Sequence, residues 1–248
     1  CLYCRTESNG KVTVIAVYVD DLVVKVARGP AEALIKRELA AIFEITFLGE
    51  CSAILGMRVT RDREAGTIAV DQERYIIDMI RKYNYEKSRA YVTPAEPDIP
   101  SGKYMCPPKD ATELDLLTTG RRTFHGPEDL ATIEKFDYRS KIGSLLYVAI
   151  RTRPDIANAV RLAAKYCNNP GLEHCRLVDR IFGYLRGQPG FRVIYGGVER
   201  LTIDIWSDAD HATDPDQRYS TSGTAIIVNG GFIFTKCRTQ TCIAGSTM

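Results

Sequence analysis

The sequence lacks the features that would place it at once among membrane or strongly charged proteins. No stretch of its 248 residues approaches the roughly 20 consecutive apolar residues that a membrane-spanning helix needs. Its 33 basic and 31 acidic residues nearly balance, so the net charge of +2 does not by itself argue for or against nucleic-acid binding. With 45% hydrophobic and 26% charged residues, the composition is that of a globular protein of one or two domains.

The N-terminal residues offer neither a charged leader nor an apolar signal core, and no initiator methionine precedes Cys1. We therefore expect the middle of a longer, intracellular protein, in a cytoplasmic particle or the nucleus. Of the eight cysteines, only Cys1 and Cys4 form a C-x-x-C pair. Because a zinc ribbon needs a second such pair, we interpret all eight as free thiols, with metal binding by Cys1 and Cys4 as the alternative.

Residues 1–92 show the periodicities of a small α+β unit. The apolar strands Val12–Val19 and Leu22–Val26 flank an acidic pair and predict a hairpin with its turn at the acids. The next predicted elements are a helix from Pro30 that buries Ile35, Leu39, Ile42 and Phe43, a second hairpin of Leu55–Val59 and Thr67–Val70, and a helix capped by Asp71.

Periodicity fails over residues 93–137, where Pro94, Pro97, Pro100, Pro107 and Pro108 predict a linker or surface excursion. Residues 138–190 predict three helices, the last of which ends at Gly187. Residues 191–248 predict strands. We expect Phe191–Tyr195 to pair with Leu201–Ser207 through Gly196–Gly197, and Leu201–Ser207, Thr224–Val228 and Phe232–Lys236 to form an antiparallel meander. The change in element type predicts a domain boundary near residue 190.

The acidic pair Asp20–Asp21 is the most informative feature of the sequence. Two adjacent carboxylates repel each other, and a cation between them removes that cost. Nucleotidyl transfer uses such a site, with two divalent ions about 3.5–4 Å apart, and oxygen ligands suit Mg²⁺. The alternative is an ordinary tight turn, in which aspartate is common. The apolar strands on both sides favour the metal site, because a rigid sheet can hold its ligands in place.

Six motifs in order resemble the reverse transcriptase of copia-type LTR retrotransposons. They are V-Y-V-D-D-L-V-V around Asp20, I-L-G-M-R-V from Ile54, Y-I followed by T-P at Tyr75 and Thr93, Y-R-S-K-I-G-S-L-L-Y from Tyr138, T-R-P-D-I from Thr152, and R-I-F-G-Y-L-R-G from Arg180. The resemblance implies a palm remnant in residues 1–92 with a thumb-like helix, and connection helices in residues 138–190.

The same resemblance assigns roles to individual residues. Asp20 and Asp21 are implied to be catalytic ligands of Mg²⁺ (or Mn²⁺), and Tyr18, Gly56 and Met57 to contact the primer. The implied partners are an RNA template, a DNA primer, dNTPs and other Gag and Pol segments. The family's third catalytic aspartate lies upstream of Cys1, so we expect the chain alone to be inactive.

A second acidic site is predicted at Asp208. Leu201, Ile203 and Ile205 alternate with Asp204, Trp206 and Asp208, as expected for a strand, and a solvated strand end is the alternative to a metal site. The segment from Ser207 resembles S-D-A-D-W-A, which opens the family's ribonuclease H domain, with His211 in place of tryptophan. The resemblance implies that Asp208 is a catalytic metal ligand acting on an RNA–DNA hybrid, in a truncated domain formed by residues 191–248.

Three interpretations remain open at this point. The chain is part of a polymerase with ribonuclease H, a non-catalytic remnant that binds nucleic acid or protein, or a pseudogene product. His174 lies near a helix start with no acid and nucleophile pair close by in sequence, and we interpret it as a packing residue. Tyr166 and Tyr184 occur at helical spacing and are interpreted as core residues.

Overall fold

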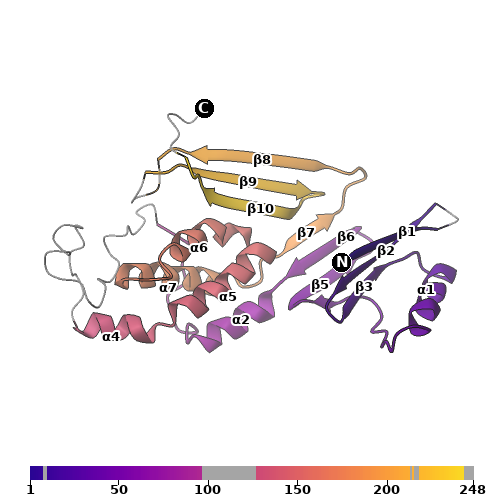
Figure 1. Ribbon diagram of the computed structural model, residues 1–248, viewed down its shortest axis with the longest axis horizontal. Coiled ribbons are helices and arrows are strands. Elements are labelled where there is room, and N and C mark those ends of the chain that lie inside the picture. The colour runs from indigo at the N-terminus through magenta and orange to yellow at the C-terminus, as the bar shows by residue number, and fades with distance from the viewer. Residues whose placement is uncertain (8–9, 97–126, 213, 215–217, 243–248) are drawn as a thin grey trace. The chain divides into compact units, whose positions relative to one another are not determined.

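The computed structural model describes residues 1–7, 10–96, 127–212, 214 and 218–242 (Figure 1). They fall into two compact units, residues 1–52 and residues 53–248. The predicted α+β class is confirmed, since the described residues form three antiparallel sheets and six α-helices. Within the described part of the chain, no helix combines the length and apolar character needed to cross a membrane.

The first unit is a three-stranded sheet followed by a helix. Its elements are β1 (Leu2–Thr6), β2 (Val12–Tyr18), β3 (Asp21–Lys25) and α1 (Pro30–Ala40). The predicted hairpin is confirmed, because β2 and β3 pair antiparallel with Tyr18 opposite Asp21. Strand β1 pairs with the other edge of β2 and was not predicted. The predicted helix face was wrong at its end: α1 ends at Ala40, and Ile42 and Phe43 lie beyond it and are exposed.

The second unit contains a four-stranded antiparallel sheet. Its strands are β4 (Ala53–Ile54), β5 (Met57–Asp62), β6 (Thr67–Asp71) and β7 (Val193–Gly196), in that order across the sheet. The predicted pairing of β7 with the strand after it was wrong, because β7 pairs with β6. At Gly196 a Cβ would lie 2.3 Å from the carbonyl oxygen of Gly66. The glycine therefore permits a close approach of β7 to the β5–β6 turn.

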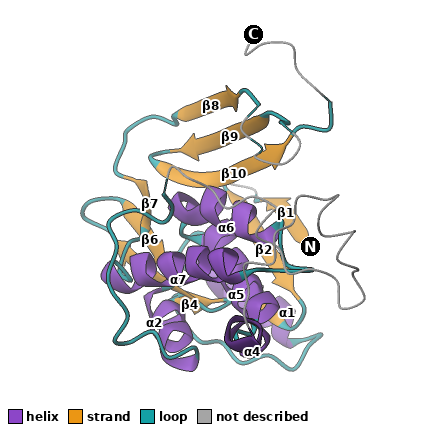
Figure 2. Cartoon of the chain, turned by 90° about the vertical axis from the view of Figure 1, so that its left-hand side faces the viewer, coloured by secondary structure: helices purple, strands orange, loops and turns teal. Residues whose placement is uncertain are grey.

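A helical layer forms the largest core (Figure 2). Its elements are α2 (Glu73–Lys82), α4 (Pro127–Lys135), α5 (Tyr138–Arg151), the 3₁₀ turn η2 (Pro154–Ile156), α6 (Ala157–Ala164) and α7 (Leu172–Gly187). The three helices predicted for residues 138–190 are confirmed, and so is the end of the last at Gly187. Side chains from α2, α5, α6 and α7 share this core, among them Ile76, Leu145, Val160, Val178 and Phe182.

Helix α4 corrects the prediction of irregular structure throughout residues 93–137. Pro127 stands at its first position, where the missing N–H costs nothing. Ile133 and Phe136, at its end and just after it, pack against the helical core. The proline-rich part of the predicted linker, residues 97–126, lies outside the described residues, as does His125.

The C-terminal sheet is the predicted antiparallel meander. It consists of β8 (Ile203–Asp210), β9 (Thr221–Val228) and β10 (Gly231–Thr239), with β9 in the centre. Asn229 and Gly230 both have positive φ angles, as the predicted tight turn requires. Strand β8 continues past Asp208 to Asp210, so Asp208 is not at the strand end as predicted. Strand β10 contacts α6 and β7, which joins this sheet to the rest of the unit (Figure 2).

Candidate functional site

The acidic pair lies at the tip of the first unit's hairpin. Val19 and Asp20 form a two-residue turn, and Asp21 is the first residue of β3. Both carboxylates are exposed, and Tyr18, at the end of β2, is 56% exposed. Val19 has a φ of 55°, which is a rare and costly conformation for a β-branched residue. The hairpin therefore presents Tyr18, Asp20 and Asp21 together at a strained turn.

The chemistry of this pair fits part of a magnesium site. Carboxylate oxygens are the ligands that Mg²⁺ prefers, and β2 is held on both sides by β1 and β3. Among the described residues, no basic side chain forms an ion pair with Asp20 or Asp21. No group of three or more metal-ligating side chains occurs in the described part of the chain. The pair thus supplies two carboxylates and does not by itself complete a ligand set.

Of the predicted primer-binding residues, Tyr18 lies in the first unit, whereas Gly56 and Met57 lie in the second, at the β4–β5 turn. Leu55 and Gly56 form a two-residue turn, and both have positive φ angles, of 49° and 68°. Gly56 is exposed, and Met57 begins β5 half-buried. The turn contacts helix α5, where the hydroxyl of Tyr147 donates a hydrogen bond to the carbonyl oxygen of Leu55.

The basic residue beside this turn, Arg58, is already paired with two carboxylates. Arg58 donates hydrogen bonds to Asp71 Oδ2 at 3.0 Å and to Glu73 Oε2 at 2.7 Å. The hydrogen bond that Arg58 donates to Asp71 raises the pKa of Arg58 above its ordinary value. The prediction that Asp71 caps α2 was wrong by one residue, because the N-cap residue is Gln72. Asp71 is buried and accepts the backbone N–H of Glu73, the first residue of the helix. Arg58 therefore ties β5 to the start of α2.

Sequence reasoning missed that one motif is built around a buried charge. Arg153, in T-R-P-D-I, is 1% exposed. Its guanidinium donates to both carboxylate oxygens of Asp155 and, at 2.6 Å, to the carbonyl oxygen of Gln188 just after α7. It also lies over the rings of Tyr184 and Phe191, 5.4 and 5.1 Å from their centroids. The motif thus joins the start of α6 to the end of α7.

A second buried network also escaped prediction. The ammonium of Lys141 donates to the hydroxyl of Tyr85 at 3.0 Å and lies 3.4 Å from the centroid of Phe136. The hydroxyl of Tyr85 donates in turn to the carboxylate of Asp179. Burial lowers the pKa of Lys141 and raises that of Asp179. No signal in the sequence distinguishes Lys141 from a solvated helix residue.

The interpretation of three other motif residues is confirmed. His174 is fully buried; its Nδ1 accepts the backbone N–H of Gly171 at 2.9 Å, and its ring stacks on Tyr166 with centroids 3.9 Å apart. Tyr166 and Tyr184 are buried, as predicted. Seven cysteines lie among the described residues, and all seven are free thiols.

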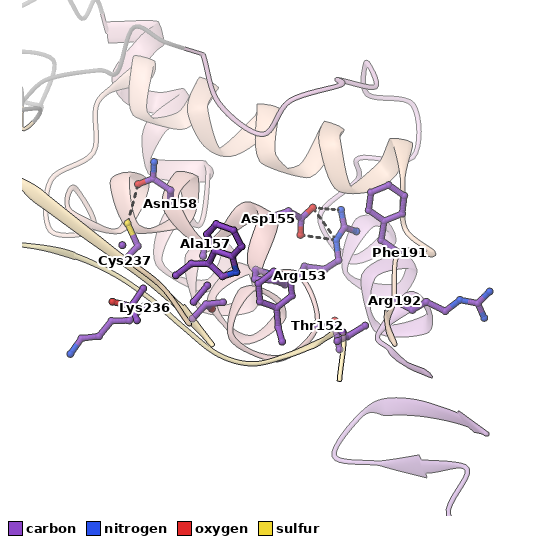
Figure 3. A pocket seen from close by; sticks show the side chains of 18 of the residues that line it. Thr152, Arg153, Asp155, Ala157, Asn158, Phe191, Arg192, Lys236 and Cys237 are labelled. Carbon is purple, nitrogen blue, oxygen red and sulfur yellow. Dashed lines mark hydrogen bonds and ion pairs between the residues drawn. The ribbon is translucent and has the colours of Figure 1, made fainter. Parts of the chain in front are cut away.

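Asp208 lies beside a cleft of 940 Å³ within the second unit (Figure 3). One wall is the C-terminal sheet, which contributes Trp206 and Asp208, and the opposite wall is the segment from Thr152 to Asn158. Figure 3 shows the two walls joined where Cys237 Sγ donates to Asn158 Oδ1 at 3.4 Å. The carboxylate of Asp208 is exposed and, among the described residues, accepts a local hydrogen bond from the N–H of Ala209.

Ile203 and Ile205, earlier on β8, are not among the residues that line the cleft, and their side chains are 58% and 68% exposed. Asp204 is exposed as well, as predicted. Three consecutive residues of β8, Trp206, Ser207 and Asp208, line the cleft, so alternation along the strand does not by itself decide which of them reach it. Asp208 belongs to the second unit and the pair Asp20–Asp21 to the first.

Comparison with known proteins assigns the class of the hairpin. Residues 1–97 match the family described as reverse transcriptase (RNA-dependent DNA polymerase). The Pol polyprotein of transposon TNT 1-94 from Nicotiana tabacum is 32% identical over the whole chain, and that of transposon RE2 from Arabidopsis thaliana is 27% identical over 85% of it. A putative transposon Ty5-1 protein of Saccharomyces cerevisiae is 26% identical over 92% of the chain and is covered over 66% of its own length.

The chain therefore belongs to the Pol polyproteins of copia-type retrotransposons, and its first 97 residues to their reverse transcriptase domain. It spans 17% of the tobacco polyprotein and 13% of the RE2 polyprotein. No solved structure matches the chain.

Proposed function

We propose that the chain carries the metal-binding hairpin and the primer grip of an RNA-directed DNA polymerase, followed by the first strands of a ribonuclease H domain. The observation that carries the proposal is the hairpin of Tyr18, Val19, Asp20 and Asp21, with both carboxylates exposed at its tip. It lies within the residues that match the reverse transcriptase family. The proposed partners are an RNA template, a DNA primer, dNTPs and other Pol and Gag segments.

In the proposed reaction, the 3′ oxygen of the primer forms a bond to the α-phosphorus of the dNTP, and the bond to pyrophosphate breaks. Bound Mg²⁺ (or Mn²⁺) would stabilise the negative charge on the reacting oxygens. Asp20 and Asp21 would hold the metal through carboxylates fixed at the end of a paired strand. The exposed ring of Tyr18 would contact the primer end, and Gly56 and Met57 would support the primer backbone.

We propose that Asp208 is one acidic ligand of the ribonuclease H site, which cleaves RNA in the hybrid. Its exposed carboxylate at the wall of an open cleft supports this role. Because nucleases of this kind need several acids, and the described residues hold no cluster of three, Asp208 alone is not expected to cleave RNA. The pair Asp20–Asp21 likewise does not complete a ligand set by itself. We therefore expect the chain alone to bind primer–template without extending the primer.

The metal site can be tested by replacing Mg²⁺ with Fe²⁺. Ferrous ion with ascorbate and peroxide produces hydroxyl radicals that cut the polypeptide near the bound metal. We expect a cut close to Val19–Leu22, lost in Asp20→Asn and in Asp21→Asn. The control is Asp78→Asn, at an exposed aspartate of α2, which should leave the cut unchanged. Cutting that is equal in all four proteins would refute the metal assignment.

The remaining alternative is a non-catalytic remnant that binds nucleic acid or protein. The two functions differ in how binding responds to metal. A polymerase segment should bind a primer–template more tightly with Mg²⁺ than without, and this gain should be lost in Asp20→Asn. Binding that is insensitive to both Mg²⁺ and the substitution would favour the remnant.

A further inference from the structure

The β4–β5 turn is held in an unfavourable conformation. Leu55 has a φ of 49°, although bulky L-residues rarely adopt a left-handed backbone. Its flanking strand β4 has only two residues, so few ladder hydrogen bonds are available to hold the turn. A turn of this kind keeps one conformation only if contacts from outside the hairpin stabilise it.

The external contact comes from Tyr147 on helix α5. Its hydroxyl donates a hydrogen bond to the carbonyl oxygen of Leu55. A Cβ built on Gly56 would lie 3.4 Å from the same hydroxyl oxygen, so the hydroxyl lies on the side of the turn to which a side chain at position 56 would point. In the sequence these groups are 92 positions apart.

The ring of Tyr147 is itself held in place. It packs edge-on against Tyr75 of α2, with centroids 5.1 Å apart and planes at 70°, a favourable arrangement for two aromatic rings. Helix α5 is fixed in turn by Leu145 and Val148, which are fully buried in the helical core. The turn is therefore supported by a rigid helix rather than by its own hairpin.

We propose that Tyr147 is a positioning residue of the primer grip: it fixes the backbone of Leu55–Gly56 in the conformation that receives the primer. The proposal rests on the proposed function, because it concerns the nucleic acid that Gly56 and Met57 would bind. It also places a determinant of primer binding outside residues 1–97, the part that matches the reverse transcriptase family.

The test removes one oxygen atom. Tyr147→Phe keeps the ring and its contact with Tyr75 but loses the hydrogen bond to Leu55. The matched control is Tyr83→Phe, which loses a part-buried hydroxyl bonded to Ser144 Oγ at 3.2 Å in the same α2–α5 interface. Two readouts are taken on the full chain: hydrogen exchange of the amides of residues 53–58, and the Kd for a fluorescein-labelled DNA primer on an RNA template.

We expect Tyr147→Phe to speed exchange at residues 53–58 and to weaken primer–template binding about two- to tenfold, the range for loss of one hydrogen bond. Tyr83→Phe should change neither. If exchange and Kd are the same in Tyr147→Phe as in the control, the positioning role is refuted. If the unmodified chain does not bind the primer–template, the proposed function fails, and faster exchange would then show only that Tyr147 stabilises the turn.

A double-substitution cycle separates positioning from general destabilisation. If Tyr147 acts through the turn, its effect on Kd should shrink once Met57→Ala has removed a primer contact at that turn. Additive effects of Tyr147→Phe and Met57→Ala would mean that Tyr147 influences binding by another route, and would overturn the proposal.

Discussion

The buried guanidinium of Arg153 gives the sharpest test of how this fold is held together. It makes a two-pronged contact with Asp155, donates to the carbonyl oxygen of Gln188, and lies over the rings of Tyr184 and Phe191. Arg153→Lys retains the positive charge but cannot reproduce the planar fork or reach both partners at once. The substitution therefore separates the contribution of hydrogen-bond geometry to stability from the contribution of the positive charge.

The expected cost follows from what is left unpaired. Breaking a buried ion pair costs about 3–5 kcal/mol, but the side chain of Asp155 is 33% exposed and keeps the hydrogen bond from the Tyr184 hydroxyl. We therefore expect Arg153→Lys to lower the free energy of unfolding by about 2–4 kcal/mol. At about 2–4 °C per kcal/mol for a protein of this size, a loss of about 3 kcal/mol corresponds to a fall in Tm of roughly 6–12 °C.

Urea unfolding measures this effect with two probes. Circular dichroism follows the helices, and the fluorescence of Trp206, the chain's single tryptophan, follows the sheet beside the cleft. The control is Arg139→Lys, an exposed arginine on α5 that donates to the carbonyl oxygen of Cys167 at 3.0 Å, and it should cost less than about 1 kcal/mol. Equal stability of the two variants would refute the reasoning.

Three further predictions concern other parts of the chain. Because burial lowers the pKa of Lys141 below its ordinary 10.5, the unfolded state binds more protons there, so stability should rise with pH as the pH approaches 10.5 from below. Lys141→Met should remove that rise in urea unfolding, whereas an unchanged slope would contradict it. Val19→Gly should relieve the strain of the positive φ at this position and stabilise the hairpin by at most about 1 kcal/mol, which would slow amide exchange in β2. Faster exchange would show that the backbone of Val19 is not strained. Amides of β8 should exchange sooner than those of α7, since β8 is exposed along its length; the reverse order would show that its open face is covered.

The sequence predicted the elements whose signals are local. Apolar runs rich in β-branched residues on both sides of two acids define the first hairpin. Asn229–Gly230 defines a tight turn, and apolar residues at helical spacing define α5, α6 and α7. Each of these signals is complete within about 20 residues, so no knowledge of distant partners is needed.

The errors arose where the deciding contact is distant in sequence. Strand β7 pairs with β6 because Gly196 allows close approach to Gly66, 130 positions earlier. Helix α4 was obscured by the proline-rich residues before it, although Ile133 packs on the core. In the sequence, Tyr147 is simply the last residue of the motif that begins at Tyr138. Its contact with Leu55 becomes visible only in the folded structure.

Burial separates two kinds of charged motif residue that the sequence presents alike. Asp20, Asp21 and Asp208 are exposed, which leaves them accessible for the metal-binding roles proposed for them. Arg153 is 1% exposed, and its guanidinium donates to Asp155 and to the carbonyl oxygen of Gln188. A buried charge without partners would cost several kcal/mol, so the arginine, the carboxylate of Asp155 and the carbonyl of Gln188 depend on one another. The motif that contains Arg153 is therefore architectural, and it holds one wall of the cleft that Asp208 faces.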